Sequence, residues 1–139
     1  MINRIVVDIG NTRITCGVFV DGKIADLSHH LLSNTQKAAA DISVDADSMH
    51  IDEIAICSVV PSVSRSLIEY LEVHHRKVFQ ITAESQTLIS GTYDSLGVDR
   101  IANIAAARAL YLKRESAIVI DCGTATTRAV TDAVCEALR

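Results

Sequence analysis

The sequence lacks several features by which large classes of protein are recognised. Its 13 lysine and arginine residues do not cluster, and with 17 acidic residues they leave a formal net charge of −4, which argues against nucleic-acid binding. No apolar run reaches the roughly 18 residues that a membrane-spanning helix needs. Asp8 interrupts the N-terminal apolar run too early for a signal peptide. We therefore expect a cytoplasmic protein that binds neither nucleic acid nor a membrane.

The cysteines, histidines and glycines also lack the spacings of familiar sites. None of the four cysteines forms a C-x-x-C pair, which favours a reduced chain. Cys57 and Cys122 lie in apolar runs and are expected to be small core residues rather than nucleophiles. The histidine pairs 29–30 and 74–75 are adjacent in sequence rather than four positions apart, so a zinc site is not expected. Neither G-x-x-x-x-G-K-[ST] nor G-x-G-x-x-G occurs, which excludes the nucleotide-binding folds built on those loops.

One short pattern, in contrast, is written twice. Residues 5–12 read IVVDIGNT and residues 118–125 read IVIDCGTA; Asp8 and Asp121 stand 113 positions apart, and the glycine two places later repeats that offset. In each copy three β-branched residues precede Asp-x-Gly, which predicts a strand ending in a tight turn, and the first of these strands is expected to be buried. One copy alone is compatible with an ordinary hairpin. Two copies suit a two-lobed phosphotransferase, in which each turn binds one side of a nucleotide's phosphates.

The hydrophobic pattern predicts an α/β fold. The 139 residues are 49% apolar, enough for a substantial core. Asp21 and Gly22 predict a two-residue hairpin turn, and Ser62 is the expected N-cap of a helix that follows Pro61. Strands are expected at 2–8, 13–20, 23–32, 53–60, 77–82, 116–123 and 124–130. Helices are expected at 35–42, 62–75 and 98–113, with a polar surface loop at 83–97. This order fits a ribonuclease H-like layer with a mixed β-sheet and flanking helices.

The first Asp-x-Gly turn carries residue types that bind phosphate. Gly10 would let a ligand approach the backbone, and Asn11, Thr12 and Thr15 can donate hydrogen bonds to phosphate oxygens. The Asp8 carboxylate would repel a phosphate directly, so its position implies a cation or a water between the two.

The segment GVDR, residues 97–100, is the second candidate. Gly97 frees the backbone at a helix start, and Asp99 then lies in the first turn, where negative charge is favoured. Arg100 offers a planar fork that suits a carboxylate. The alternative is a plain helix N-terminus with a solvated arginine.

Four blocks in this order resemble the signature motifs of type III pantothenate kinases, members of the actin-like and sugar-kinase ATPase superfamily. They are DIGNT at 8–12, SVVP at 58–61, GVDRIAN at 97–103 and DCGTATT at 121–127. The fold implied by the resemblance has two ribonuclease H-like lobes, each beginning with its own phosphate hairpin. The first lobe would cover residues 1–115, and residues 116–139 would begin the second.

The resemblance also implies roles for individual residues. Asp99 resembles the catalytic base, Asp121 the ligand of a monovalent cation (K⁺ or NH₄⁺), and Thr124 a phosphate contact of the second hairpin. The ATP-phosphate segment would comprise Asp8, Ile9, Gly10, Asn11, Thr12, Arg13, Ile14 and Thr15. The pantothenate contacts would be Tyr93, Gly97, Val98, Asp99 and Arg100.

The implied activity is ATP-dependent phosphorylation of pantothenate to 4′-phosphopantothenate, the first step of coenzyme A biosynthesis. Mg²⁺ and the monovalent cation would be cofactors, and a homodimer is expected. Because the family continues well beyond this sequence, we expect an N-terminal portion with a truncated second lobe. The alternative function is a non-catalytic or regulatory binding module with an actin-like fold, or an inactive fragment of the kinase.

Overall fold

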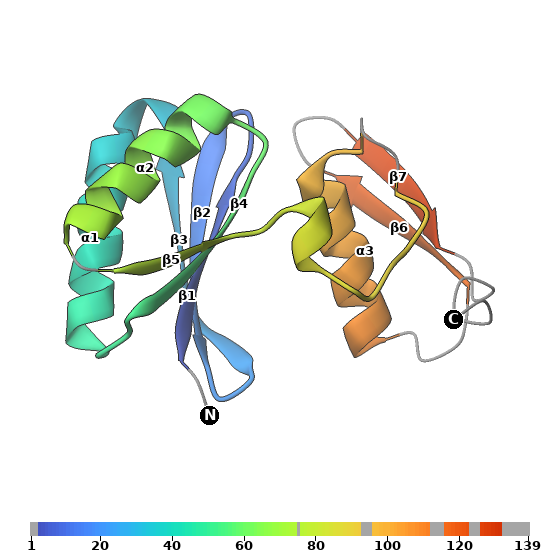
Figure 1. The fold of residues 1–139 in the computed structure, drawn as a ribbon, viewed down its shortest axis with the longest axis horizontal. Helices are drawn as coiled ribbons and strands as arrows, with labels where there is room; N and C mark the ends of the chain where they lie inside the picture. The colour runs from blue at the N-terminus through green and yellow to red at the C-terminus, as the bar shows by residue number, and fades with distance from the viewer. Residues whose placement is uncertain (1–2, 75, 93–95, 112–115, 123–125, 132–139) are drawn as a thin grey trace. The chain divides into compact units, whose positions relative to one another are not determined.

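The computed structural model describes residues 3–74, 76–92, 96–111, 116–122 and 126–131 (Figure 1). The chain forms two compact units, Met1–Gln80 and Ile81–Arg139. The predicted lobe boundary between residues 115 and 116 stays a prediction, because a compact unit need not coincide with a lobe of the family fold.

The described part of the first unit contains a five-stranded mixed sheet in the order β3-β2-β1-β4-β5 (Figure 1). Strands β1 and β2 and strands β2 and β3 pair antiparallel, whereas β4 is parallel to both β1 and β5. The predicted hairpin turn is confirmed, because Asp21 and Gly22 have φ values of 50° and 81°, as the favoured two-residue turn requires. The strand bounds are β1 Arg4–Ile9, β2 Arg13–Val20, β3 Lys23–Leu31, β4 Glu53–Ser58 and β5 Lys77–Gln80.

Helices α1 (Thr35–Ser48) and α2 (Pro61–Val73) cover one face of this sheet (Figure 1). The covered face is formed by alternate β-branched residues, which fit a pleated surface well. The fully buried isoleucines and leucines of this core are Ile5, Ile9, Ile14, Ile42, Ile51, Ile54, Ile56, Leu67 and Leu71.

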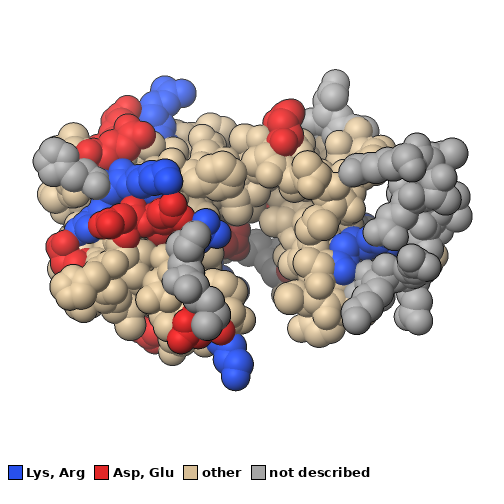
Figure 2. All heavy atoms as spheres, turned by 60° about the horizontal axis from the view of Figure 1, so that its bottom comes forward, with Lys and Arg blue, Asp and Glu red and all other residues tan. Residues whose placement is uncertain are grey.

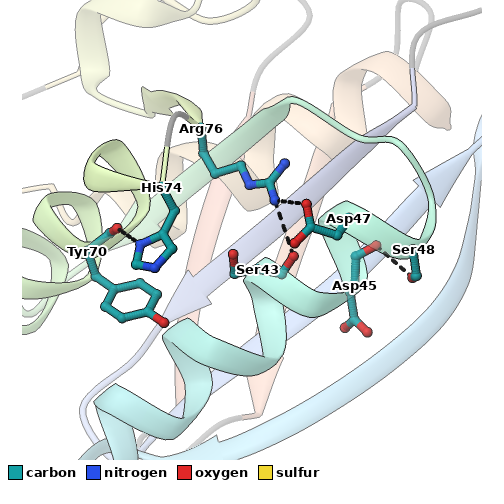
Figure 3. Close-up of polar contacts among 7 residues, drawn as sticks. All are labelled: Ser43, Asp45, Asp47, Ser48, Tyr70, His74 and Arg76. Atoms are coloured by element: carbon teal, nitrogen blue, oxygen red, sulfur yellow. Dashed lines mark hydrogen bonds and ion pairs between the residues drawn. The ribbon is translucent and has the colours of Figure 1, made fainter.

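Helix α1 is longer than predicted, since it ends at Ser48 rather than at residue 42. Residues 43–48 read SVDADS, which apart from Ala46 are weak helix formers. The buried positions Ala38, Ala39, Ile42, Ser43 and Ala46 nevertheless keep the helix packed on the sheet to its end. Arg76 reinforces that end: it forms an ion pair with Asp47, and its Nη2 lies 3.4 Å from the Ser43 carbonyl oxygen (Figure 3). Tertiary packing therefore overrides local propensity here.

The start of α2 also corrects a prediction. Val60 is the N-cap and Pro61 opens the helix, so Ser62 lies inside it and is not the cap. Ser58 instead binds the backbone at the start of the helix, since its Oγ accepts a hydrogen bond from the Val60 N–H at 3.0 Å. At the other end, the His74 ring stacks on Tyr70, with Nδ1 2.8 Å from the Tyr70 carbonyl oxygen (Figure 3).

The opposite face of the sheet carries an apolar row across all five strands. The strand registers place Leu27, Gly17, Val6, Ala55 and Phe79 side by side. Leu27 and Phe79 are more than half exposed. The row that follows towards the C-terminal end of β1 is polar, and it belongs to the candidate site described below.

Acidic and basic side chains are intermingled on the face of the first unit seen in Figure 2. One ion-paired group links three strands of the sheet. Glu53 on β4 accepts hydrogen bonds from Arg4 on β1 at 2.8 Å and from Lys77 on β5 at 2.9 Å. These bonds, the one from Lys77 foremost, hold the pKa of the Glu53 carboxyl below its ordinary value.

The second unit contains α3 (Val98–Leu110) and a two-stranded antiparallel sheet of β6 (Ala117–Cys122) and β7 (Thr126–Thr131). Ile101, Ile104 and Arg108 form the buried side of α3. The expectation that Cys57 is a core residue is confirmed, whereas Cys122 is exposed, so that expectation was wrong. The alternating burial along β6 places the Cys122 side chain on the same side of the strand as the exposed Ile118 and Ile120.

Short helical turns complete the described chain. Leu32–Asn34 and Ala83–Ser85 form 3₁₀ turns, the second inside the predicted loop. Gln86 orders the residues around it, because its amide contacts the Ala83 and Ile89 carbonyl oxygens at 3.3 and 3.0 Å and accepts the Ile89 N–H at 2.9 Å. No helix in the described ranges is both long and apolar enough to cross a membrane.

Candidate functional site

Each unit contains one group of candidate residues, and the two groups are described separately. In the first unit, Asp8 is the penultimate residue of β1 and stands opposite Thr15 of β2. The connecting turn is closed by a 3.0 Å hydrogen bond from the Gly10 N–H to the Arg13 carbonyl. A Cβ at position 10 would meet only that carbonyl oxygen, at 3.7 Å. Because this is an ordinary contact, no neighbour in the described chain demands glycine here, and the open space agrees with the close approach of a ligand.

The residues of the predicted phosphate segment differ in how far they are buried. Asn11 and Thr12 are exposed in the turn, and Arg13 is exposed at the start of β2. The Thr12 carbonyl accepts a 3.4 Å hydrogen bond from the Leu32 N–H. Ile9 and Ile14, in contrast, are fully buried in the core. Their side chains cannot touch ATP, so these two residues could contribute only backbone groups.

A polar row crosses the sheet at the level of Asp8. The registers align His29, Thr15, Asp8 and Cys57 on β3, β2, β1 and β4. Thr15 Oγ1 and His29 Nδ1 lie 3.2 Å apart. His30 alternates to the helix-covered face, where its Nδ1 is 3.8 Å from Asp41, so the two adjacent histidines do not share a ligand set.

His29 was not anticipated from the sequence, and a β-bulge explains why. The turn at Asp21 and Gly22 alone would pair Thr15 with Ser28. The register shifts between Val18 and Phe19, and this one-residue irregularity brings His29 opposite Thr15 instead.

In the second unit, Asp99 lies in the first turn of α3, as predicted. Its Oδ1 accepts a 2.8 Å hydrogen bond from the Arg100 backbone N–H, which also lies 3.1 Å from the Gly97 carbonyl oxygen at the start of the helix. Gly97 lies directly against this carboxylate, because a Cβ there would be 2.5 Å from Asp99 Oδ1. Val98, Asp99 and Arg100 are all half-buried. The Arg100 N–H therefore holds the Asp99 carboxylate in place, and a side chain at position 97 would collide with it.

The end of β6 lies beside this helix. Asp121 is the penultimate residue of β6 and stands opposite Thr127 of β7. The prediction that Asp8 and Asp121 each end a strand that pairs antiparallel with the next strand is thus confirmed, whereas the predicted turn at 123–125 lies outside the described residues. Asn103 of α3 donates a hydrogen bond from Nδ2 to Asp121 Oδ2 at 3.2 Å. This link was not anticipated from the sequence, although Asn103 follows Asp99 at the four-residue spacing that shares a helix face.

Some expectations lie outside the described residues, namely those for Tyr93 and Thr124. Among the residues that are described, no group of three or more histidine, cysteine, aspartate or glutamate side chains is arranged to hold a metal ion. Asp121 instead offers one carboxylate at a strand end.

Solved structures with a similar fold have low sequence identity to this chain. A ROK hexokinase from Thermus thermophilus matches with a TM-score of 0.54 at 15% identity, over 94% of this chain and 46% of the hexokinase. A Ppx/GppA family protein from Aquifex aeolicus matches with a TM-score of 0.51 at 18% identity, over 95% of this chain and 48% of that protein. These likenesses concern the fold alone, and they confirm the predicted α/β class with its mixed sheet.

Sequence relatives are closer. The type III pantothenate kinase from Halalkalibacterium halodurans is 35% identical over 142 aligned positions, covering 88% of this chain and 52% of the relative. The enzyme of the same name from Endomicrobium trichonymphae is 33% identical over 138 positions, covering 86% and 52%. The chain spans about half the length of the curated relatives it matches. A model of the family described as type III pantothenate kinase matches residues 4–137. The chain therefore belongs to the type III pantothenate kinase family.

Proposed function

We propose that this chain contributes the phosphate hairpin, the catalytic base and the pantothenate segment of an ATP-dependent pantothenate kinase. The product would be 4′-phosphopantothenate, in the first step of coenzyme A biosynthesis. The observation that carries the proposal is the family match over residues 4–137, which includes all four motif blocks.

The ATP phosphates are assigned to the turn between β1 and β2. Asn11 and Thr12 are exposed there, and the lack of a side chain at Gly10 lets phosphate oxygens approach the backbone N–H groups of these two residues. Thr15 adds a hydroxyl from the adjoining polar row, and Thr124 is the proposed phosphate contact of the second hairpin. Bound ATP supplies the phosphoryl group, and Mg²⁺ bound to its phosphates would offset their charge.

Asp99 is assigned the role of general base. The Arg100 N–H occupies Oδ1 of Asp99, which leaves Oδ2 to accept the proton of pantothenate's primary hydroxyl. The hydroxyl oxygen then bonds to the γ-phosphorus in line with the departing ADP. The Arg100 guanidinium would bind the pantothenate carboxylate as a planar fork, with Tyr93, Gly97 and Val98 lining the same segment.

Asp121 is assigned to a monovalent cation, K⁺ or NH₄⁺. The support is the resemblance of the DCGTATT block to the family motif, together with the position of Asp121 near the end of β6. A cytoplasmic homodimer completes the proposal, and it rests on the family resemblance and on the composition.

A chimeric enzyme tests this function. Residues 1–139 replace the matching part of the Halalkalibacterium relative, and ADP release is measured with and without pantothenate. We expect pantothenate-dependent turnover in the usual range of about 1 s⁻¹ or more, and its loss in the Asp99→Asn chimera. A folded chimera that binds ATP but forms no phosphopantothenate, while the relative does, would favour the non-catalytic binding module.

A further inference from the structure

The contact between Asn103 and Asp121 joins the two functional elements of the second unit. Asn103 is one turn along α3 from Asp99, and its Nδ2 lies 3.2 Å from Oδ2 of Asp121, 18 positions away in the sequence. Because residues four apart share a helix face, the side of α3 that bears Asp99 also bears the contact to β6.

The chemistry of the pair fixes which atoms meet. An ionised carboxylate can only accept hydrogen bonds, so the Asn103 amide must present its NH₂ group. Oδ2 of Asp121 is thereby engaged. Within the described part of the chain no further hydrogen bond to Oδ1 is observed, so this oxygen remains for another ligand.

We infer that Asn103 is a positioning residue, whose amide holds the Asp121 carboxylate against α3 so that Oδ1 is directed to the cation. The inference rests on the proposed cation role of Asp121. Partners of a ligating carboxylate orient it and tune its affinity for the ion. The same contact connects the proposed cation ligand to the helix that carries the proposed base.

Asn103 has little structural value apart from this bond. It is exposed on α3, so it contributes little packing to the core. Asparagine is also a poorer helix former than the alanines that occupy much of this helix. A merely structural position on this surface would favour alanine, and the amide is therefore best explained by the carboxylate that it contacts.

The first test uses the 139-residue chain with ATP and ¹³C NMR of the Asp121 carboxyl carbon. KCl replaces tetramethylammonium chloride stepwise, so that the ionic strength stays constant during the titration. We expect a saturable K⁺-dependent shift, and an apparent K⁺ affinity about tenfold lower in Asn103→Ala. Gln36→Ala is the matched control, since it removes an exposed amide from helix α1 of the other unit. An unchanged K⁺ affinity in a folded Asn103→Ala chain, or a wild-type resonance that ignores K⁺, would overturn the inference.

The second test uses the chimeric enzyme and separates positioning from stability. Positioning predicts that Asn103→Ala raises the K⁺ concentration for half-maximal activity about tenfold and leaves kcat at saturating K⁺ nearly unchanged. Equal loss of activity at all K⁺ concentrations, together with a lowered Tm, would show a structural role and contradict the inference. If the chimera is inactive, the proposed function fails, while the NMR titration still decides the role of Asn103.

Discussion

Replacing Gly97 by alanine should damage catalysis without damaging the fold. Gly97 has φ −58° and ψ 140°, a conformation open to any L-residue. The backbone therefore does not require glycine. The added methyl group, however, would lie 2.5 Å from Oδ1 of Asp99, so the carboxylate has to move.

The size of the effect follows from the geometry. To reach an ordinary contact of 3.4 Å, Oδ1 must retreat by about 0.9 Å, and the 2.8 Å bond from the Arg100 N–H is then lost. Misplacing a reacting group by about 1 Å costs on the order of 10²-fold in rate, or about 2.7 kcal/mol in the barrier. Stability should change little, because Gly→Ala gains about 0.4–1 kcal/mol from the unfolded chain and this offsets much of the lost hydrogen bond.

The assay compares kcat/KM and Tm for the chimeric enzyme and its Gly97→Ala variant. Ala109→Ser, an equally small change at an exposed position of α3, is the matched control and should retain full activity. The ¹³C resonance of the Asp99 carboxyl, recorded in the 139-residue chain, reports the displacement directly. A Gly97→Ala enzyme with unaltered kcat/KM and a shifted Asp99 resonance would refute the claim that the carboxylate must stay where Gly97 allows it.

Three further results are expected. Asp99→Asn in the chimeric enzyme should lower kcat by about 10²- to 10⁴-fold with ATP affinity nearly unchanged; normal turnover would rule out the base. Glu53→Gln should destabilise the chain at neutral pH, because hydrogen bonds lower the Glu53 pKa in the folded state. The stabilisation by the ionised carboxylate is present above its unfolded pKa of about 4.3 and is lost as the pH falls through the lower folded pKa. The denaturation curves of both proteins should therefore converge in acid. Burial raises the pKa of the Cys16 thiol to about 11, so iodoacetamide should label the exposed Cys122 in the native chain and reach Cys16 only after unfolding; rapid native labelling of Cys16 would contradict its burial.

The sheet of the first unit was predictable because its strands carry strong local signals. Runs of β-branched residues indicated each buried strand, and the Asp21-Gly22 dipeptide indicated a tight turn whose positive φ values are observed. Local signals failed where long-range packing decides the outcome. The second half of α1 has weak propensity, and it is helical because Ala46 and its neighbours pack on the sheet.

The candidate site was predictable as a set of residues but not as a set of contacts. Asp8 and Asp99 were identified from motifs, and each lies at the strand end or helix start expected for it. The partners came only from the structure. His29 reaches Thr15 through a bulge that no sequence rule indicates, and Asn103 reaches Asp121 only because α3 packs beside β6.

The pairing registers of the two hairpins bear on how the hairpins could be exchanged by protein engineering. Ile9 pairs with Ile14, whereas Cys122 pairs with Thr126, so three residues intervene in the second hairpin where four intervene in the first. A swap guided by the constant offset of 113 between the motifs would therefore carry one residue too many into β7. Because side chains alternate strictly along a strand, that single residue would turn every later β7 side chain to the opposite face of the hairpin. A functional transplant must delete one turn residue.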